Sequence, residues 1–274
     1  MQELDAVIQA AVVRETPDLW VLPQEKGQTI AETFGIALRD VERRALEKEI
    51  LPQRYRRNWS ALGLRAQLRL HTSTVALVGL GGLGGYVLEL LARCGVGRVR
   101  GVDGDVFEPS NLNRQLLAEQ TTLGQPKAEA AARRVLAINP TIVFEPVQEM
   151  LGYTEFVQWI AQSDLVVDAL GGTRIRLALH KAAAEQGIQV VSAAVAGATG
   201  IIATIAPGDE RLRALWQDER GAEEDMGCLA HGVAVLAGMQ CAEVVNILSG
   251  KGPALQGCFG ALDLNDFSWE RLSL

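Results

Sequence analysis

Apolar and polar positions follow one another in a regular rhythm from about Thr74 onward. Short apolar runs alternate with segments in which apolar residues recur at helical spacing. The runs TVALVGL, GRVRGVD, TIVFEPVQ, DLVVDAL and IQVVSAAV predict buried strands. The segments between them predict helices over 83–94, 126–139, 155–161 and 174–186. This alternation predicts an α/β protein with a doubly wound, Rossmann-like, mostly parallel sheet.

The rhythm changes after residue 200. A further apolar run, GIIATIAP, is followed by a polar loop over 208–226 that holds seven acidic residues and three arginines. A long apolar helix is predicted over 232–248. The final stretch, GCFGALDLNDFSWERLSL, alternates like two antiparallel strands around a turn at Asn265 and Asp266.

The first 53 residues have a different pattern, which predicts a short helical N-terminal segment ahead of a large domain over 54–274. Apolar residues recur at helical spacing at Phe34, Leu38, Val41 and Leu46, and Pro52 ends the helical pattern. From Glu42 to Arg57, six basic residues accompany three acidic ones. Two short helices joined at Gly35 would suit a DNA-binding motif, but other basic clusters are missing. We therefore favour a packing or dimerisation segment.

Composition narrows the class of protein. The 274 residues are 48% hydrophobic, which permits a sizeable core, and the net charge of −7 argues against general affinity for nucleic acid. Glu3 and Asp5 stand where a secretory signal peptide would carry positive charge. We see no apolar run of about 20 residues, the length of a transmembrane helix. We expect a soluble cytoplasmic protein without a membrane segment. No structural zinc is expected, because no CxxC pair occurs among Cys94, Cys228, Cys241 and Cys258.

A nucleotide-binding loop is predicted where the first of these strands meets its helix. Gly79, Gly81 and Gly84 of GLGGLGG stand in the GxGxxG spacing, and Gly82 between them is a further candidate for binding the nucleotide. Such glycines allow a tight turn and let a phosphate approach the N-terminus of the helix. Asp103, 22 residues after Gly81, ends the next strand and is placed to accept hydrogen bonds from ribose hydroxyls. An NAD enzyme would fit these residues equally well.

The residues that follow Asp103 favour ATP over a dinucleotide. The stretch SNLNRQ supplies Asn111, Arg114 and Gln115, and Lys127 opens the next helix in GQPKAEAA. Two cations and two amides just beyond the ribose suit a triphosphate, since negative charge builds up on departing pyrophosphate. Nothing after Asp103 suits hydride transfer, so an NAD oxidoreductase is the weakest alternative.

Together, GLGGLGG, VDGDVFEPSNLNRQ, LGQPKAEAA and RYRRN resemble the ThiF/MoeB/HesA family, relatives of the ubiquitin-activating enzymes. The resemblance begins at about Arg54 and reaches the C-terminus. It implies an adenylyltransferase that binds Mg-ATP and a small ubiquitin-like (β-grasp) sulfur-carrier protein ending in Gly-Gly. Such an enzyme adenylates the terminal carboxylate of its carrier and releases pyrophosphate.

The resemblance also assigns roles to residues. The glycine loop would hold the phosphates and Asp103 the ribose, while the triphosphate would be bound and neutralised by Asn111, Arg114, Gln115 and Lys127. Arg57 of one subunit would reach into the ATP site of its partner in a homodimer. The polar loop over 208–226 would be the crossover loop, beneath which the tail of the carrier passes.

The chain departs from this family where magnesium is bound. The family has an aspartate–asparagine pair after the fourth strand, and VVDALGGTRIR has Gly171 and Gly172 there. Asp105 and Asp168 are the remaining candidate Mg²⁺ ligands, since magnesium often takes only one or two carboxylates. The crossover loop has no cysteine, and Cys228 is the nearest candidate for a thioester or persulfide, although a structural role is favoured. A tRNA-directed enzyme and a non-catalytic carrier-binding member of the family remain alternatives.

Overall fold

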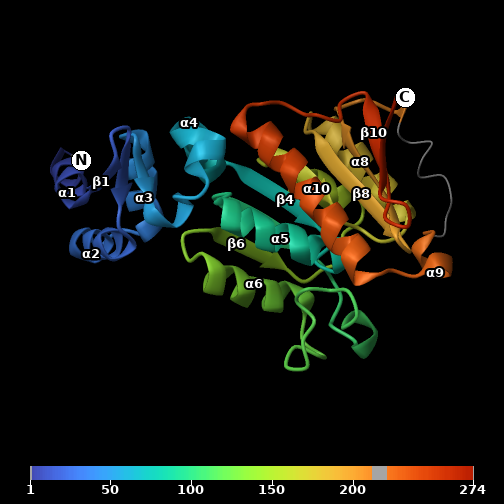
Figure 1. Ribbon diagram of the computed structural model, residues 1–274. Helices are drawn as coiled ribbons and strands as arrows, with labels where there is room; N and C mark the ends of the chain where they lie inside the picture. The colour runs from blue at the N-terminus through green and yellow to red at the C-terminus, as the bar shows by residue number, and fades with distance from the viewer. Residues whose placement is uncertain (1, 212–220, 274) are drawn as a thin grey trace.

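One long sheet runs through the computed structural model, which describes residues 2–211 and 221–273 (Figure 1). Its eight strands, within those residues, lie in the order β11-β10-β9-β8-β7-β4-β5-β6. Their bounds are β4 (Thr74–Val78), β5 (Arg98–Val102), β6 (Val143–Val147), β7 (Leu165–Asp168), β8 (Val190–Ala196), β9 (Thr199–Ile205), β10 (Cys258–Asp263) and β11 (Ser268–Ser273).

The sheet is parallel from β6 to β8 and antiparallel from β8 to β11. The predicted doubly wound sheet and its antiparallel C-terminal strands are therefore confirmed, including the turn at Asn265 and Asp266 between β10 and β11. In this topology the carboxyl ends of β4, β5 and β7 meet at one edge, which is where α/β proteins bind their ligands.

Helices cover both faces of this sheet. One face carries α4 (Trp59–Thr72), α5 (Gly82–Cys94), α6 (Lys127–Ile138) and α10 (Ala230–Ser249), and the other carries α7 (Tyr153–Trp159) and α8 (Arg174–Glu185). Successive residues of β4 serve the two cores in turn: Val75 and Leu77 pack beneath α5, while Ala76 and Val78 pack towards α8. Burial on both faces explains why these strands are continuous apolar runs.

Helix α10 is long and apolar enough to cross a membrane by length and composition, although the sequence pattern indicated no such run. In the fold it packs against α5 and β8, and more than half of its apolar window is buried. Val233, Leu236 and Val244 belong to the main core. Burial inside the protein thus accounts for its apolar composition.

A small unit precedes the large domain and lies at one end of the molecule (Figure 1). The two predicted helices are present, α2 (Gln24–Phe34) and α3 (Leu38–Glu47), and they are joined at Gly35, which adopts a left-handed conformation. The sequence pattern did not predict α1 (Gln2–Ala11), α4, or the three-stranded sheet of β1 (Val13–Thr16), β2 (Leu19–Leu22) and β3 (Ile50–Pro52). Strands of three or four residues are too short to show a period.

The basic residues of this unit are engaged in ion pairs. Arg44 bonds Asp5 through two nitrogens, and Arg54 joins Glu42 to Asn139 of the large domain. Tyr55 accepts a further hydrogen bond from Asn139. The local positive charge that suggested a DNA-binding motif is thus largely paired within the protein.

Candidate functional site

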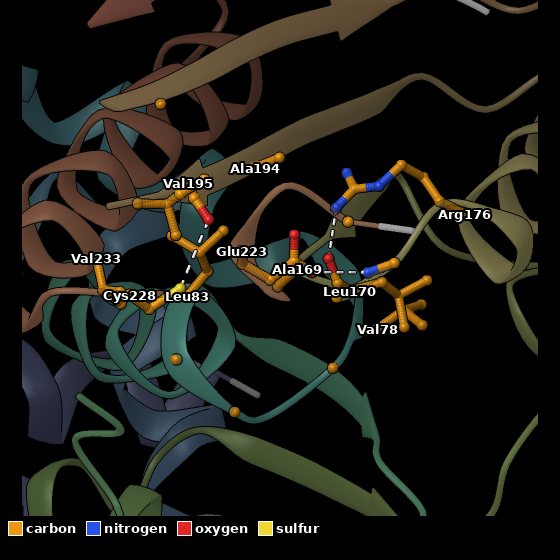
Figure 2. A pocket seen from close by; sticks show the side chains of 18 of the residues that line it. Val78, Leu83, Ala169, Leu170, Arg176, Ala194, Val195, Glu223, Cys228 and Val233 are labelled. Atoms are coloured by element: carbon orange, nitrogen blue, oxygen red, sulfur yellow. Dashed lines mark hydrogen bonds between the residues drawn. The ribbon is translucent and has the colours of Figure 1, made fainter. Parts of the chain in front are cut away.

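A cavity of about 860 Å³ opens at the carboxyl ends of β4, β5 and β7. Its lining includes the glycine loop, residues of the segment from Asp103 to Lys127, and the β7 end with the start of α9 (Glu223–Met226). Residues of β8 to β11 complete the wall. Figure 2 shows part of this wall, with Leu83, Leu170 and Glu223 drawn from three different elements. Its position matches the ligand crevice that the topology defines.

The glycine loop is held by contacts that only glycine permits. Gly79 has a φ of 91°, and a Cβ there would lie 2.6 Å from the Ala169 carbonyl oxygen. A Cβ on Gly84 would lie 1.8 Å from the Gly79 carbonyl oxygen, because α5 crosses very close to the loop. Gly81 and Gly82 begin α5 and line the cavity. The free amides of this helix N-terminus suit an anion such as phosphate.

Asp103, directly after β5, connects the glycine loop with the next segment. Its carboxylate accepts hydrogen bonds from the amides of Leu80 (Oδ2, 2.8 Å) and Asp105 (Oδ1, 2.9 Å). The side chain is only 9% exposed, yet it lines the cavity. These two bonds hold the carboxylate in one orientation at the position predicted for a ribose.

Two cations and an amide line the same cavity as Asp103. Lys127, buried at the start of α6, donates from Nζ to Asp105 Oδ2 at 2.8 Å and lies 3.9 Å from Asp103 Oδ1. Arg114 donates to the Ser110 carbonyl and to Asn113 Oδ1, both at 2.9 Å. The Oε1 atom of Gln115 is buried without a hydrogen-bond partner. An unpaired buried oxygen on a cavity wall is costly and indicates a polar ligand.

Two predicted residues lie elsewhere. Asn111 is not among the described residues that line the cavity, and its Oδ1 accepts from the Glu108 amide at 3.0 Å, which closes the 3-10 turn Pro109–Asn111. It therefore shapes the loop that carries Arg114. Arg57 is exposed and lies outside the described lining of the cavity in its own chain.

Asp168, at the end of β7, is completely buried and its carboxylate is fully engaged. Oδ2 accepts from Arg176 (2.6 Å), Ser192 (2.7 Å) and the ring of His180 (2.8 Å), and Oδ1 accepts from the Leu170 amide (3.2 Å). Burial acts to raise its pKa, but the Arg176 charge and the bonds from His180 and Ser192 hold the pKa below its ordinary value. This geometry disfavours Asp168 as a direct metal ligand.

The sequence interpretation missed Arg176 and Glu223. Arg176 also donates to the Leu170 carbonyl and so fixes the turn after β7 (Figure 2). Glu223 lines the cavity and its Oε1 accepts from the Gly172 amide at 3.0 Å. Of the predicted crossover loop, residues 212–220 lie outside the described residues.

Cys228 also lines the cavity, but its thiol is turned towards the Val195 carbonyl, 3.6 Å away (Figure 2). Burial raises the pKa of this thiol, the Arg114 charge lowers it, and the Glu223 charge raises it, with a net increase. A raised pKa keeps the thiol protonated at neutral pH, which disfavours nucleophilic chemistry.

The fold and the cavity define a doubly wound α/β protein whose ligand crevice has a glycine-rich loop on one side and an acidic strand end on the other. Comparison with known proteins specifies its family. The model of the ThiF family matches residues 54–274, and the chain belongs to this family.

Curated relatives support this membership. The chain is 36% identical over 216 residues to the SAMP-activating enzyme E1 of Haloferax volcanii, which covers 76% of this chain and 79% of that protein. It is 33% identical over 196 residues to the molybdopterin-synthase adenylyltransferase of Escherichia coli, which covers 70% of this chain and 79% of the relative. The crystal structure of E. coli MccB with ATP shares the fold, with a TM-score of 0.70, 19% identity, and coverage of 90% and 82% of the two chains.

Proposed function

We propose that the protein is an ATP-dependent adenylyltransferase that activates the C-terminal carboxylate of a small ubiquitin-like sulfur-carrier protein ending in Gly-Gly. One observation carries the choice of ATP. Arg114, Lys127 and the unpaired Oε1 of Gln115 lie on the same wall as the glycine loop and Asp103. The names of the relatives, among them a sulfur carrier protein adenylyltransferase of Thermus thermophilus, support the carrier as the substrate.

In this proposal, ATP lies across the cavity with its ribose at Asp103 and its triphosphate beside the glycine loop. An oxygen of the carrier carboxylate forms a bond to the α-phosphorus. The bond from that phosphorus to the bridging oxygen breaks, and pyrophosphate leaves with the electron pair. The carboxylate is already an anion at neutral pH, so no general base is required. Arg114 and Lys127 neutralise the charge that develops on the pyrophosphate.

The residues present fit a Mg²⁺ ion held mainly by ATP. Across residues 2–211 and 221–273, no group of three or more histidine, cysteine, aspartate or glutamate side chains can hold a metal by itself. Magnesium commonly takes one or two carboxylates together with phosphate oxygens and water. Of the two candidates from the sequence, Asp105 is the one whose side chain is exposed (53%), but its Oδ2 already accepts from Lys127 Nζ at 2.8 Å. When bound, the ion would help to neutralise the triphosphate.

We further propose a cytoplasmic homodimer. Arg57 is exposed and outside the described lining of its own cavity, so a role in catalysis requires it to enter the site of a second subunit. Two-fold symmetry would then create two composite sites, each built from both chains.

Carrier-dependent exchange of labelled pyrophosphate into ATP tests the proposal. A set of purified β-grasp carriers ending in Gly-Gly is compared with the same carriers lacking the last glycine. Exchange with one intact carrier and none with its truncated form is the expected result. Exchange driven by tRNA, or none with any carrier while ATP binds, would contradict the proposed reaction.

A further inference from the structure

A glutamate from a remote element occupies the space that Gly171 leaves open at the end of β7. Gly171 and Gly172 line the cavity but contribute no side chain to it. The Oε1 atom of Glu223, on α9, accepts a hydrogen bond from the Gly172 amide at 3.0 Å. A Cβ built on Gly171 would lie 3.4 Å from the same oxygen. The Glu223 carboxylate thus lies within reach of where an acidic side chain at 171 would extend.

The backbone beside Glu223 accommodates this arrangement. A Cβ on Gly221 would lie 2.1 Å from Glu223 Oε2, so the carboxylate folds over a residue that has no side chain. Gly221 is buried and, like Glu223, lines the cavity. Figure 2 shows Glu223 beside the turn that carries Ala169 and Leu170. The carboxylate therefore belongs to the cavity wall.

A second, independent feature of the cavity points to a polar ligand. Gln115 is more than nine-tenths buried, its Oε1 has no partner, and its amide lies against Gly81 of the glycine loop. Lys127 and Arg114 supply positive charge on the same wall. A ligand that satisfies these groups carries several oxygens and negative charge, as a nucleotide triphosphate does.

We propose that Glu223 is the carboxylate that binds the Mg²⁺ of Mg-ATP in this chain, in place of the aspartate that Gly171 lacks. This inference rests on the proposed function. The two Mg²⁺ candidates from the sequence are less suited, because Asp168 is buried with Arg176 and Asp105 is paired with Lys127. One protein carboxylate suffices when phosphate oxygens and water complete the octahedral shell.

Moving the carboxylate from position 223 to position 171 tests this assignment. Glu223→Gln removes the negative charge, and the double variant Gly171→Asp/Glu223→Gln restores a carboxylate at position 171. Gly171 tolerates this change because its φ lies outside the left-handed region and its Cβ would meet only ordinary contacts, whereas Gly172 has a φ of 73°. Asp225→Asn, on the same short helix, is the matched control, since Asp225 is exposed and outside the described lining.

Calorimetry measures ATP binding with Mg²⁺ and with EDTA, and electron paramagnetic resonance counts Mn²⁺ bound with α,β-methylene ATP. In Glu223→Gln, we expect metal-dependent affinity to fall by about tenfold or more while metal-free ATP binding is unchanged. The double variant should regain most of the loss, and Asp225→Asn should match the wild type.

Three results would overturn the inference, and they separate it from the proposed function. Full metal-dependent affinity in Glu223→Gln would remove Glu223 as the ligand but leave an ATP enzyme. An equal loss in Asp225→Asn would indicate a general effect of charge. Failure of the wild-type protein to bind ATP in any condition would refute the proposed function itself.

Discussion

Asp103 and Asp168 stand at the carboxyl ends of β5 and β7, the two strands that flank β4, yet one side chain faces the cavity and the other is buried. The Asp103 carboxylate accepts hydrogen bonds from two backbone amides, lies 3.9 Å from Lys127 Nζ and faces the cavity. Asp168 has no exposed surface; its Oδ2 accepts from Arg176, His180 and Ser192, and its Oδ1 accepts from the Leu170 amide. The same residue type at the same kind of position therefore faces the cavity in one case and is buried within the fold in the other.

The elements that pack against each strand end account for the difference. After β5 the chain runs out into the loop that carries Arg114, so Asp103 stays open on one side. After β7 a short turn over 169–173 leads into α8, and Arg176 of that helix points back over the strand end (Figure 2). A strand-end carboxylate is thus available for a ligand only where the following element leaves the crevice open.

The largest expected effect comes from removing the partner of Asp168. Arg176→Met leaves a buried carboxylate without its cation, which should lower the free energy of unfolding by about 3–5 kcal/mol. Urea unfolding followed by circular dichroism measures it. Arg114→Met is the matched control and should cost less than about 1 kcal/mol, because this half-buried arginine pairs with no carboxylate among the described contacts. Equal unfolding free energies for Arg176→Met and Arg114→Met would show that the ion pair with Asp168 does not stabilise the fold.

On the Asp103 side, Arg114→Ala should impair the reaction and leave the fold intact. Loss of a charge-assisted contact in the transition state should slow carrier-dependent pyrophosphate exchange about a hundredfold, or about 3 kcal/mol. Exchange kinetics and urea unfolding are measured on the same preparation. Unchanged exchange would mean that this cation does not touch the triphosphate.

Acid should act through Asp168. A carboxyl group whose pKa is lowered in the folded state contributes stability that is present above its unfolded pKa of 3.8 and is lost as the pH falls through the folded value. Asp168→Asn should therefore be less stable at neutral pH but show a flatter decline in unfolding free energy below about pH 5. Chemical unfolding at several pH values measures both slopes. Parallel slopes would show that the Asp168 pKa is not lowered by folding.

Local contacts explain which parts of this molecule the sequence could predict. The apolar runs of the main strands and the glycine spacing from Gly79 to Gly84 are visible in the local sequence, and the predicted strands are confirmed. Nucleotide binding by the loop stays a prediction. The partners of Asp168 are not local, since Ser192 lies 24 positions along the chain. Glu223 bonds Gly172, which is 51 positions away in the chain, and the spacing of apolar residues cannot predict such a contact. The strands β1 to β3 escaped prediction because each is too short to show a period, and β3 also pairs with β2 from about 30 positions away.

Mixed dimers would show whether Asp103 serves its own cavity while Arg57 serves that of the partner. Asp103→Ala and Arg57→Ala proteins should each be nearly inactive in exchange. After random reassembly of equal amounts, half of the dimers are mixed, and each has one intact site, so activity should recover to about a quarter of the wild type. Tagged chains confirm subunit exchange. No recovery despite confirmed mixing would leave Arg57 as a surface residue.

The smallest effect on pyrophosphate exchange should come from replacing Cys228. This residue lines the cavity, as Asp103 does, but its thiol is directed into the fold, as the Asp168 carboxylate is. Its thiol faces the Val195 carbonyl, and burial raises its pKa, so little thiolate is present at neutral pH. In the proposed reaction the carrier carboxylate attacks phosphorus directly and no thiol takes part. Cys228→Ala should therefore keep its exchange rate within about twofold of the wild type. Exchange is measured beside ATP affinity and urea unfolding, so that damage to the fold is recognised. Loss of exchange in a folded, ATP-binding variant would show that the thiol takes part in the reaction, although it faces the Val195 carbonyl.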